Sequence, residues 1–330
     1  MDHPYMSGLL YPSQHLGPNA DIEEIIASQN IISRVMHSYF GVLVPLGFLA
    51  GIVSVVTIIW NKVKHQTMGH LDFYLLNLSI TDLTIILYSF TAITRPNYMN
   101  ITNLSCGVLA TFFNLSYFYS QILLLLMLLL LVFVNESNTN SLVAKATQHR
   151  KVCACIMLLI SLILSKLVVS QLGTYKDLNS TIHCQLDPLN AQPEYDFVKF
   201  SLGFCLPSFL ILILFVMLLV RLVTGVSGVK ERVKEQVVVL LNISVVFAVR
   251  LFYNIMLIRR TQLKLQGVYL HPREELILNI AELVLFSGSC LGLMSIPTLY
   301  KPCRIRVWGA LQFIKKKCGG TQTSMSVEMK

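Results

Sequence analysis

The sequence predicts an all-α integral membrane protein, namely a seven-transmembrane helix bundle with its N-terminus outside the cell and a short amphipathic eighth helix. The first observation is composition. Of 330 residues, 54% are hydrophobic and 13% are charged, whereas about 25% are charged in a typical soluble domain. The second is that the apolar residues form long blocks, and a helix of roughly 20 apolar residues spans the hydrocarbon of a bilayer. These features exclude a soluble globule, a disordered chain and a coiled coil.

Seven apolar blocks follow one another along the chain, and each is long enough to cross a membrane. Helix is the structure expected for each block, because every backbone polar group must find a partner inside lipid. The blocks comprise residues 38–60, 71–93, 108–134, 152–172, 197–222, 237–258 and 276–300. They divide the chain into an extracellular N-terminal tail (1–36), the bundle (37–300), a membrane-parallel amphipathic helix (301–318) and a cytosolic tail (319–330).

The basic residues between the blocks indicate the orientation, because cytosolic loops are enriched in Lys and Arg. The loops after the first, third and fifth blocks carry, with the C-terminal tail, 16 basic residues, against 8 on the opposite face. Lys199 is counted with the external loop that precedes the fifth block, while Lys166 and Arg250 lie inside blocks. The net charge of +9 is therefore mainly a signal of topology, and we expect no nucleic-acid partner.

Glycosylation sequons agree with this orientation. Asn100 and Asn103 begin sequons in the loop after the second block, and Asn179 begins one in the loop after the fourth. All three fall on the external face, where Asn-X-Ser/Thr can be modified. Asn135 begins a sequon on the cytosolic face and should stay bare. The sequons at Asn77, Asn114 and Asn242 lie inside spans, where we interpret them as chance matches.

Two of the eight cysteines lie on the external side. Cys106 opens the third span and Cys184 lies in the loop between the fourth and fifth. Because disulfides form in oxidising compartments and are rare in the cytosol, we expect these two cysteines to pair. On the cytosolic side, Cys318 follows three consecutive lysines. A juxtamembrane cysteine beside basic residues is a candidate for palmitoylation, and the lysines favour anionic membrane lipid.

Several segments share the order and spacing of a known family. They are the NLSITDL segment from Asn77 to Leu83 with its acid Asp82, then Ser120 fourteen residues after Cys106, the FCLP segment that ends at Pro207, and the PTLY segment from Pro297 to Tyr300. A basic stretch from Arg304 to Lys317 follows. Together with seven spans and an external N-terminus, these segments resemble the rhodopsin-like (class A) G-protein-coupled receptors over residues 35–318.

The resemblance implies functional roles for these positions. Pro207, Pro297 and Tyr300 match residues that act as conformational switches in the family, and residues 304–317 match its eighth helix. Asp82 and Ser120 match a buried polar core that could hold a sodium ion. The alternative for Asp82 is an acid, ionised or protonated, that is hydrogen-bonded between helices. The family also implies an extracellular ligand of a class that the motifs do not identify, a heterotrimeric G protein or arrestin as cytosolic partner, and a place in the plasma membrane.

This chain departs from the family at its activation motifs. No Asp-Arg-Tyr closes the third span, and the arginine position falls on Leu131. The sixth span has no proline, the fourth has no tryptophan, and Ile296 stands where the seventh usually has asparagine. In the family, the arginine engages the G protein and the sixth-span proline supplies a kink. The chain thus resembles a divergent receptor of the orphan or virally encoded type.

Charged residues inside spans are costly, by about 2.5–3.5 kcal/mol on insertion scales, and so they are candidate functional residues. Arg250 lies in the sixth span and Glu282 in the seventh. They could pair with each other, or Arg250 could meet an acidic group of a ligand. Phe113 and Tyr117 are four residues apart and share a helix face, as do Arg250 and Tyr253 at a spacing of three. We therefore predict a ligand pocket of these five residues, with helix packing as the alternative for the aromatic ones.

Other functions fit less well. No span carries GxSxG or HExxH, so we expect no enzyme activity, no cofactor and no metal centre. A transporter would show inverted repeats and broken spans, which are not evident. The seventh span has no lysine for a retinal Schiff base. The sequence therefore favours a ligand-sensing receptor. The alternative is a seven-helix decoy, scaffold or dimer partner that does not signal, as the missing Asp-Arg-Tyr suggests.

Overall fold

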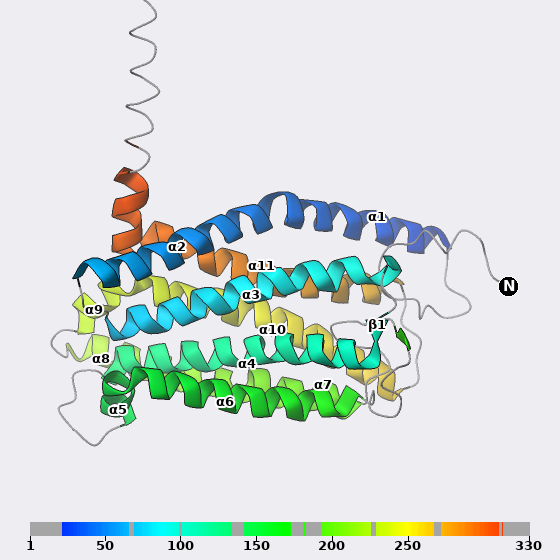
Figure 1. The fold of residues 1–330 in the computed structure, drawn as a ribbon. Coiled ribbons are helices and arrows are strands. Elements are labelled where there is room, and N and C mark those ends of the chain that lie inside the picture. Colours follow the sequence, from blue (N-terminus) through cyan, green and yellow to red (C-terminus); the bar gives the residue numbers. More distant parts are fainter. Residues whose placement is uncertain are drawn as a thin grey trace, which may run out of the picture.

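A computed structural model describes residues 22–65, 69–98, 101–133, 142–172, 181–182, 193–225, 229–266, 272–309 and 312. Within these ranges, seven helices are long and apolar enough to cross a membrane. Figure 1 shows them packed lengthwise into one bundle. Large apolar side chains on the outside of the bundle, such as Phe209 (61% exposed) and Leu212 (58%), suit contact with lipid tails. The predicted seven-helix membrane fold is confirmed.

The first span is longer than predicted. Helix α1 (Ile22–Ser38) continues through a π-helical turn, η2 (Tyr39–Leu43), into α2 (Val44–His65). Helical structure therefore begins within the stretch predicted as the N-terminal tail. Ile25 and Ile32 lie two turns apart on one face and are buried, and α1 packs against the seventh span. Polar residues interrupt this stretch, but the buried stripe of Ile25 and Ile32 and an ion pair of 2.6 Å from Arg273 to Glu24 hold the extension in place.

The other spans lie close to their predicted positions. The connecting loops include short helices, α5 (Leu142–Gln148) and α9 (Val229–Glu235). The second to fourth spans are α3 (His70–Tyr98), α4 (Asn103–Phe133) and α6 (Arg150–Val169), the last followed by a 3₁₀ turn, η3 (Ser170–Leu172). The fifth is α7 (Pro193–Phe200), a π-helical turn, η5 (Ser201–Cys205), and α8 (Leu206–Val223). The sixth is α10 (Val237–Leu265) and the seventh is α11 (Pro272–Leu299).

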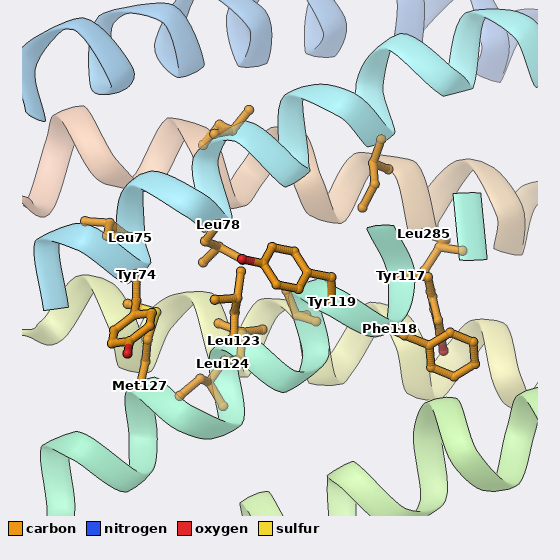
Figure 2. Close-up of a cluster of buried hydrophobic side chains, with 14 of the residues drawn as sticks. Tyr74, Leu75, Leu78, Tyr117, Phe118, Tyr119, Leu123, Leu124, Met127 and Leu285 are labelled. Carbon is orange, nitrogen blue, oxygen red and sulfur yellow. The ribbon is translucent and has the colours of Figure 1, made fainter. Parts of the chain in front are cut away.

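Helix α4 is the centre of the bundle. It packs against α3, α6, α8 and α10, and 72% of its most apolar window is buried, against 33% for the first and fourth spans. Figure 2 shows the core that it forms with α3, to which Leu75 and Leu78 contribute from α3 and Leu123 and Leu124 from α4. The run of leucines in α4 is apolar all round because neighbouring helices cover most of its surface.

A short antiparallel pair of strands lies at the outer end of α4. Strand β1 (Ile101–Thr102) pairs with β2 (Thr181–Ile182), with Ile101 opposite Ile182. Strand β2 belongs to the loop between the fourth and fifth spans, so this pairing fastens the loop beside the first turn of α4. Cys106 is disulfide-bonded, while its expected partner Cys184 lies outside the described residues.

The chain turns sharply after α11. Residues 301–309 are helical, and Figure 1 shows this segment, in orange, running across the bundle axis as a membrane-parallel helix does. Cys303 is fully buried and hydrogen-bonded to Thr57 of α2, and burial raises the pKa of its thiol to about 11. The guanidinium of Arg306 lies 5.5 Å from the ring centroid of Trp60. These contacts dock the eighth helix on the inner end of the first span.

Candidate functional site

A buried lysine occupies the outer half of the bundle. Lys199 lies on α7, and its side chain is 0% exposed. Its ammonium group donates a hydrogen bond of 2.8 Å to the hydroxyl of Tyr253 on α10. The neighbouring acid Asp196 is also buried and accepts a hydrogen bond of 3.0 Å from Thr261, again on α10. Two polar contacts thus fasten α7 to α10 and fix the helix turn from which Lys199 projects.

Aromatic rings surround this ammonium. Its nitrogen lies 5.2 Å from the ring centroid of Phe113, 5.8 Å from Tyr117, 5.7 Å from Tyr195 and 5.2 Å from Tyr253. A cation within about 6 Å of an aromatic centroid is attracted by the negative face of the ring. We call Phe113, Tyr117, Tyr195 and Tyr253 the aromatic cage. It draws its walls from three separate spans, so its shape depends on how those spans pack.

One wall of the cage also contacts a second cation. The guanidinium carbon of Arg250 lies 4.0 Å from the ring centroid of Tyr117. Arg250 is 4% exposed, and it donates hydrogen bonds to the Tyr117 carbonyl (3.0 Å), to Oε1 of Gln121 (2.7 Å) and to Oγ of Ser120. Asn254 adds a hydrogen bond of 3.1 Å to the Tyr117 hydroxyl. Helix α10 is thereby joined to α4 by a buried, charge-assisted network.

A π-helical turn lets the fifth span approach this network. Gly203 lies within η5, and a Cβ atom on it would stand 2.8 Å from a ring carbon of Tyr117 and 3.1 Å from one of Phe118. The shorter of these contacts means that a side chain at this position would have to displace the Tyr117 ring. Isolated π-helical turns are frequent at functional sites, and this one lies directly between Lys199 and the predicted switch residue Pro207.

Below Arg250 lies a polar group between α3, α10 and α11. Asp82 is hydrogen-bonded to Ser289, and Asn242 donates a hydrogen bond of 2.8 Å to Ser295. Gly292 leaves room for them, because a Cβ there would meet Oδ1 of Asn242 at 2.6 Å and Oδ2 of Asp82 at 3.4 Å. The family usually has an asparagine at the position of Ile296 in the seventh span. Here Asn242 of the sixth span supplies an amide to the polar group instead.

The predicted sodium position between Asp82 and Ser120 does not fit a cation in this arrangement. Sodium needs hard oxygen ligands that are free to coordinate it. The Ser120 hydroxyl instead accepts a hydrogen bond from the Arg250 guanidinium. A fixed positive charge therefore stands at the oxygen that would have to bind sodium, and the two cations would repel each other.

Two contacts mark the cytosolic end. Tyr300 is hydrogen-bonded to Asp72 of α3. Arg221 of α8 donates a hydrogen bond of 2.8 Å to the Val132 carbonyl and lies 4.7 Å from the ring centroid of Phe133. Since the last carbonyls of a helix lack partners within it, Arg221 caps α4 where the family has its Asp-Arg-Tyr.

The structure brings together four of the five predicted pocket residues. Phe113, Tyr117 and Tyr253 surround Lys199, and Arg250 lies against Tyr117. The pair predicted between Arg250 and Glu282 is not formed, because the guanidinium binds α4. Glu282 is half-buried on α11. To meet an acidic ligand group, as also predicted, Arg250 would have to leave its partners on α4.

Sequence reasoning missed Lys199, Gln121 and Asn242. Lys199 lies at the third position of the predicted fifth block, next to the external loop. The signal that identifies it is its position as an ionisable residue in a span, which marks a functional site by default. The same signal applies to Gln121 and Asn242, whose amides lie within apolar blocks. Asn242 matches a sequon inside a span, and the structure places its amide in the polar core.

The predicted modification sites are mostly outside the described residues. Asn100, Asn179 and Cys318 all lie there. Asn103 is described as the first residue of α4, and its side chain is only 8% exposed. Burial at the outer end of a helix disfavours a glycan on Asn103 in the folded chain.

The comparisons with known proteins agree with this arrangement of helices. A family profile described as "7 transmembrane receptor (rhodopsin family)" matches residues 51–292, from the first span to the seventh. No curated protein matches the chain. The family profile covers more than half of the sequence, and the seven spans, the disulfide-bonded Cys106 and the crosswise eighth helix stand where the resemblance placed them. The chain belongs to the rhodopsin family of seven-transmembrane receptors.

Proposed function

We propose that this receptor senses an extracellular ligand in the outer half of its bundle and reports it to a heterotrimeric G protein or arrestin through the packing of α10 against α4. The observation that carries this proposal is the buried guanidinium of Arg250, which joins these two helices. Receptors of the rhodopsin family generally signal through G proteins, and we propose a G protein or arrestin as the partner of this chain.

The route from ligand to cytosol runs through Tyr117. Its ring is both a wall of the aromatic cage and the surface on which Arg250 lies. A ligand shifts a conformational equilibrium only if it binds the two states with different affinity. A ligand that moves the Tyr117 ring meets this condition, since the Arg250 contacts change with the ring. Release of Arg250 would free α10 to move relative to α4.

A second function, as a non-signalling scaffold or decoy, has one observation in its favour. Leu131 occupies the position of the missing arginine and is buried, so the third span offers no charge to a G protein there. Arg221 supplies a positive charge at this end of α4 from the fifth span instead. Whether that charge serves a cytosolic partner separates the two functions.

Ligand-free expression in cells that carry G-protein and arrestin sensors tests the proposal. Three chains are compared at matched surface expression: the wild type, Arg250→Met, and Arg273→Ala as an exposed external control. We expect Arg250→Met to raise basal output in at least one sensor and Arg273→Ala to match the wild type. Silence of all three chains in every sensor would favour the scaffold.

We also propose that the receptor carries N-glycans on its external face and a lipid-anchored cysteine on its cytosolic face. Glycans on Asn100 and Asn179 and a palmitate on Cys318 are consistent with the external and cytosolic faces of the bundle. Enzymatic removal of N-glycans should lower the apparent mass of the wild type. Asn179→Gln should remove one glycan, while Asn135→Gln should remove none. A glycan lost from Asn135→Gln would contradict the orientation.

A further inference from the structure

The aromatic cage has the chemistry of a recognition site for an organic ammonium group. Its rings stand 5.2–5.8 Å from one ammonium nitrogen, and the Tyr253 hydroxyl accepts a hydrogen bond from it. Aromatic cages recognise alkylammonium ligands because their ring faces attract a cation that has left water. The present occupant is part of the chain, since the ammonium belongs to Lys199.

We propose that the aromatic cage is the binding site for a cationic amine ligand, and that Lys199 fills it in the resting receptor as a tethered mimic of that ligand. A free amine binds by displacing the Lys199 ammonium. This inference rests on the proposed function, because it names the ligand class of the same outer site. The proposed ligand class is thus a cationic amine, in place of the acidic ligand that the sequence suggested from Arg250 alone.

The surroundings of Lys199 allow such an exchange. The ammonium is carried on a flexible four-carbon stem, and the π-helical turn η5 begins two residues after Lys199. A change of register at a π-helical turn re-aims the side chains of the helix before it. The cage also shares Tyr117 with Arg250, so a different occupant is sensed at the contact between α10 and α4.

Chemical rescue of a shortened side chain tests the proposal on the purified full-length receptor. Lys199→Ala removes the last three carbons and the ammonium, and n-propylammonium has this shape and charge. The measurement is the thermal unfolding midpoint as n-propylammonium chloride is raised. 1-Propanol supplies the neutral probe and sodium propionate the acidic one. Lys166→Ala is the matched control, because Lys166 lies in the outer half of a span but is exposed.

We expect Lys199→Ala to lower the midpoint and n-propylammonium to restore it with saturation. Neither 1-propanol nor propionate should do so, and Lys166→Ala should not respond to any probe. No rescue by n-propylammonium, or equal rescue by 1-propanol, would overturn the proposal. Rescue by propionate alone would show an acid-binding site and overturn it as well.

A measurement on the wild type keeps the proposal testable if Lys199→Ala does not fold. A water-soluble acylating reagent modifies accessible lysines, and peptide mass spectrometry reads each position. We expect tetramethylammonium chloride to raise the acylation of Lys199 with saturation, while equal sodium chloride leaves it unchanged and Lys151 serves as an exposed reference. Constant protection of Lys199 would overturn the proposal. Neither measurement needs a signalling partner, so this proposal and the proposed function can fail separately.

Discussion

The guanidinium of Arg250 lies 4.0 Å from the ring centroid of Tyr117 and donates a 3.0 Å hydrogen bond to the carbonyl oxygen of the same residue. One arginine of the sixth span therefore contacts both the ring and the backbone of a residue in the third span. No proline kinks the sixth span at this depth. The buried cation is the device that positions α10 on α4 in this receptor.

A substitution of Gln121 measures how much the hydrogen bonds of Arg250 contribute to the free energy of unfolding. Gln121→Leu removes the side-chain oxygen that accepts a 2.7 Å hydrogen bond from Arg250 and leaves the guanidinium buried with one partner fewer. We expect a loss of about 1–3 kcal/mol in the free energy of unfolding, the cost of an unsatisfied buried polar group. The double variant Gln121→Leu/Arg250→Met should lose less than the sum of the two single variants, because it removes both partners.

An exposed ion pair provides the contrast. Arg259 and Glu274 are 2.5 Å apart, but the arginine side chain is 57% exposed. Exposed pairs contribute about 0–1 kcal/mol, so Glu274→Gln should change stability far less than Gln121→Leu. Additive effects of Gln121→Leu and Arg250→Met would contradict a direct contact between the two residues.

Gly203 should tolerate no side chain. Gly203→Ala places a methyl group against the Tyr117 ring, and we expect a loss of about 1–3 kcal/mol, as for overpacked cores. Gly41 lies in the other π-helical turn of the bundle's described part, and a Cβ there meets nothing within 4 Å. Gly41→Ala is therefore the matched control, expected to be neutral or stabilising. Thermal unfolding of both variants gives the comparison, and equal effects would refute the close packing at η5.

Cys303 should resist thiol reagents. Its side chain is fully buried and its thiol pKa is raised to about 11, so the reactive thiolate is scarce at neutral pH. Labelling by a water-soluble maleimide should stay slow at pH 7–8 and accelerate as the pH rises toward the folded-state value or as the chain unfolds. Peptide mass spectrometry reads the position, and the same chain unfolded in denaturant gives the reference rate. Labelling of Cys303 as fast in the folded receptor as in the unfolded chain would contradict its docked position.

Cys106 and Cys184 should behave as one unit. If they form the external disulfide, Cys106→Ser, Cys184→Ser and the double variant should lose the same amount of stability, about 2–5 kcal/mol for a native disulfide. Peptide mapping without reductant should yield one cross-linked pair that contains both residues. A further loss in the double variant, or a different partner for Cys106, would show that the pairing is wrong.

The seven spans could be predicted because each apolar block is long, and because a helix satisfies the backbone hydrogen bonds of a segment inside lipid. The helical extension from Ile22 to Ser38 could not be predicted. Ile25 and Ile32 form only a narrow buried stripe, and the helix that it packs against, α11, lies about 250 residues further along the chain. Periodicity shows which residues share a face, and it does not show what that face meets.

The candidate site illustrates the same limit. The four-residue spacing of Phe113 and Tyr117 correctly placed their rings together. The partner of Arg250 could not be deduced from spacing, since acceptors on α4 and the acid Glu282 on α11 were both compatible with a bundle. Burial of Lys199 depends on the packing of α7 against α10 and on the rings of Phe113 and Tyr117 from α4, and no local pattern in residues 193–200 encodes that.

A distance measurement across the cytosolic face tests most directly whether Arg250 holds α10 against α4. Spin labels are placed on cysteines introduced at Lys151 and Val237, which are exposed near the inner ends of α6 and α10, in a background without other reactive cysteines. Helix α6 packs on α4 and so serves as the reference. For the ligand-free receptor, the account predicts one short-distance population with Arg250 intact and an added longer-distance population in Arg250→Met. The same distance distribution in both chains would contradict it.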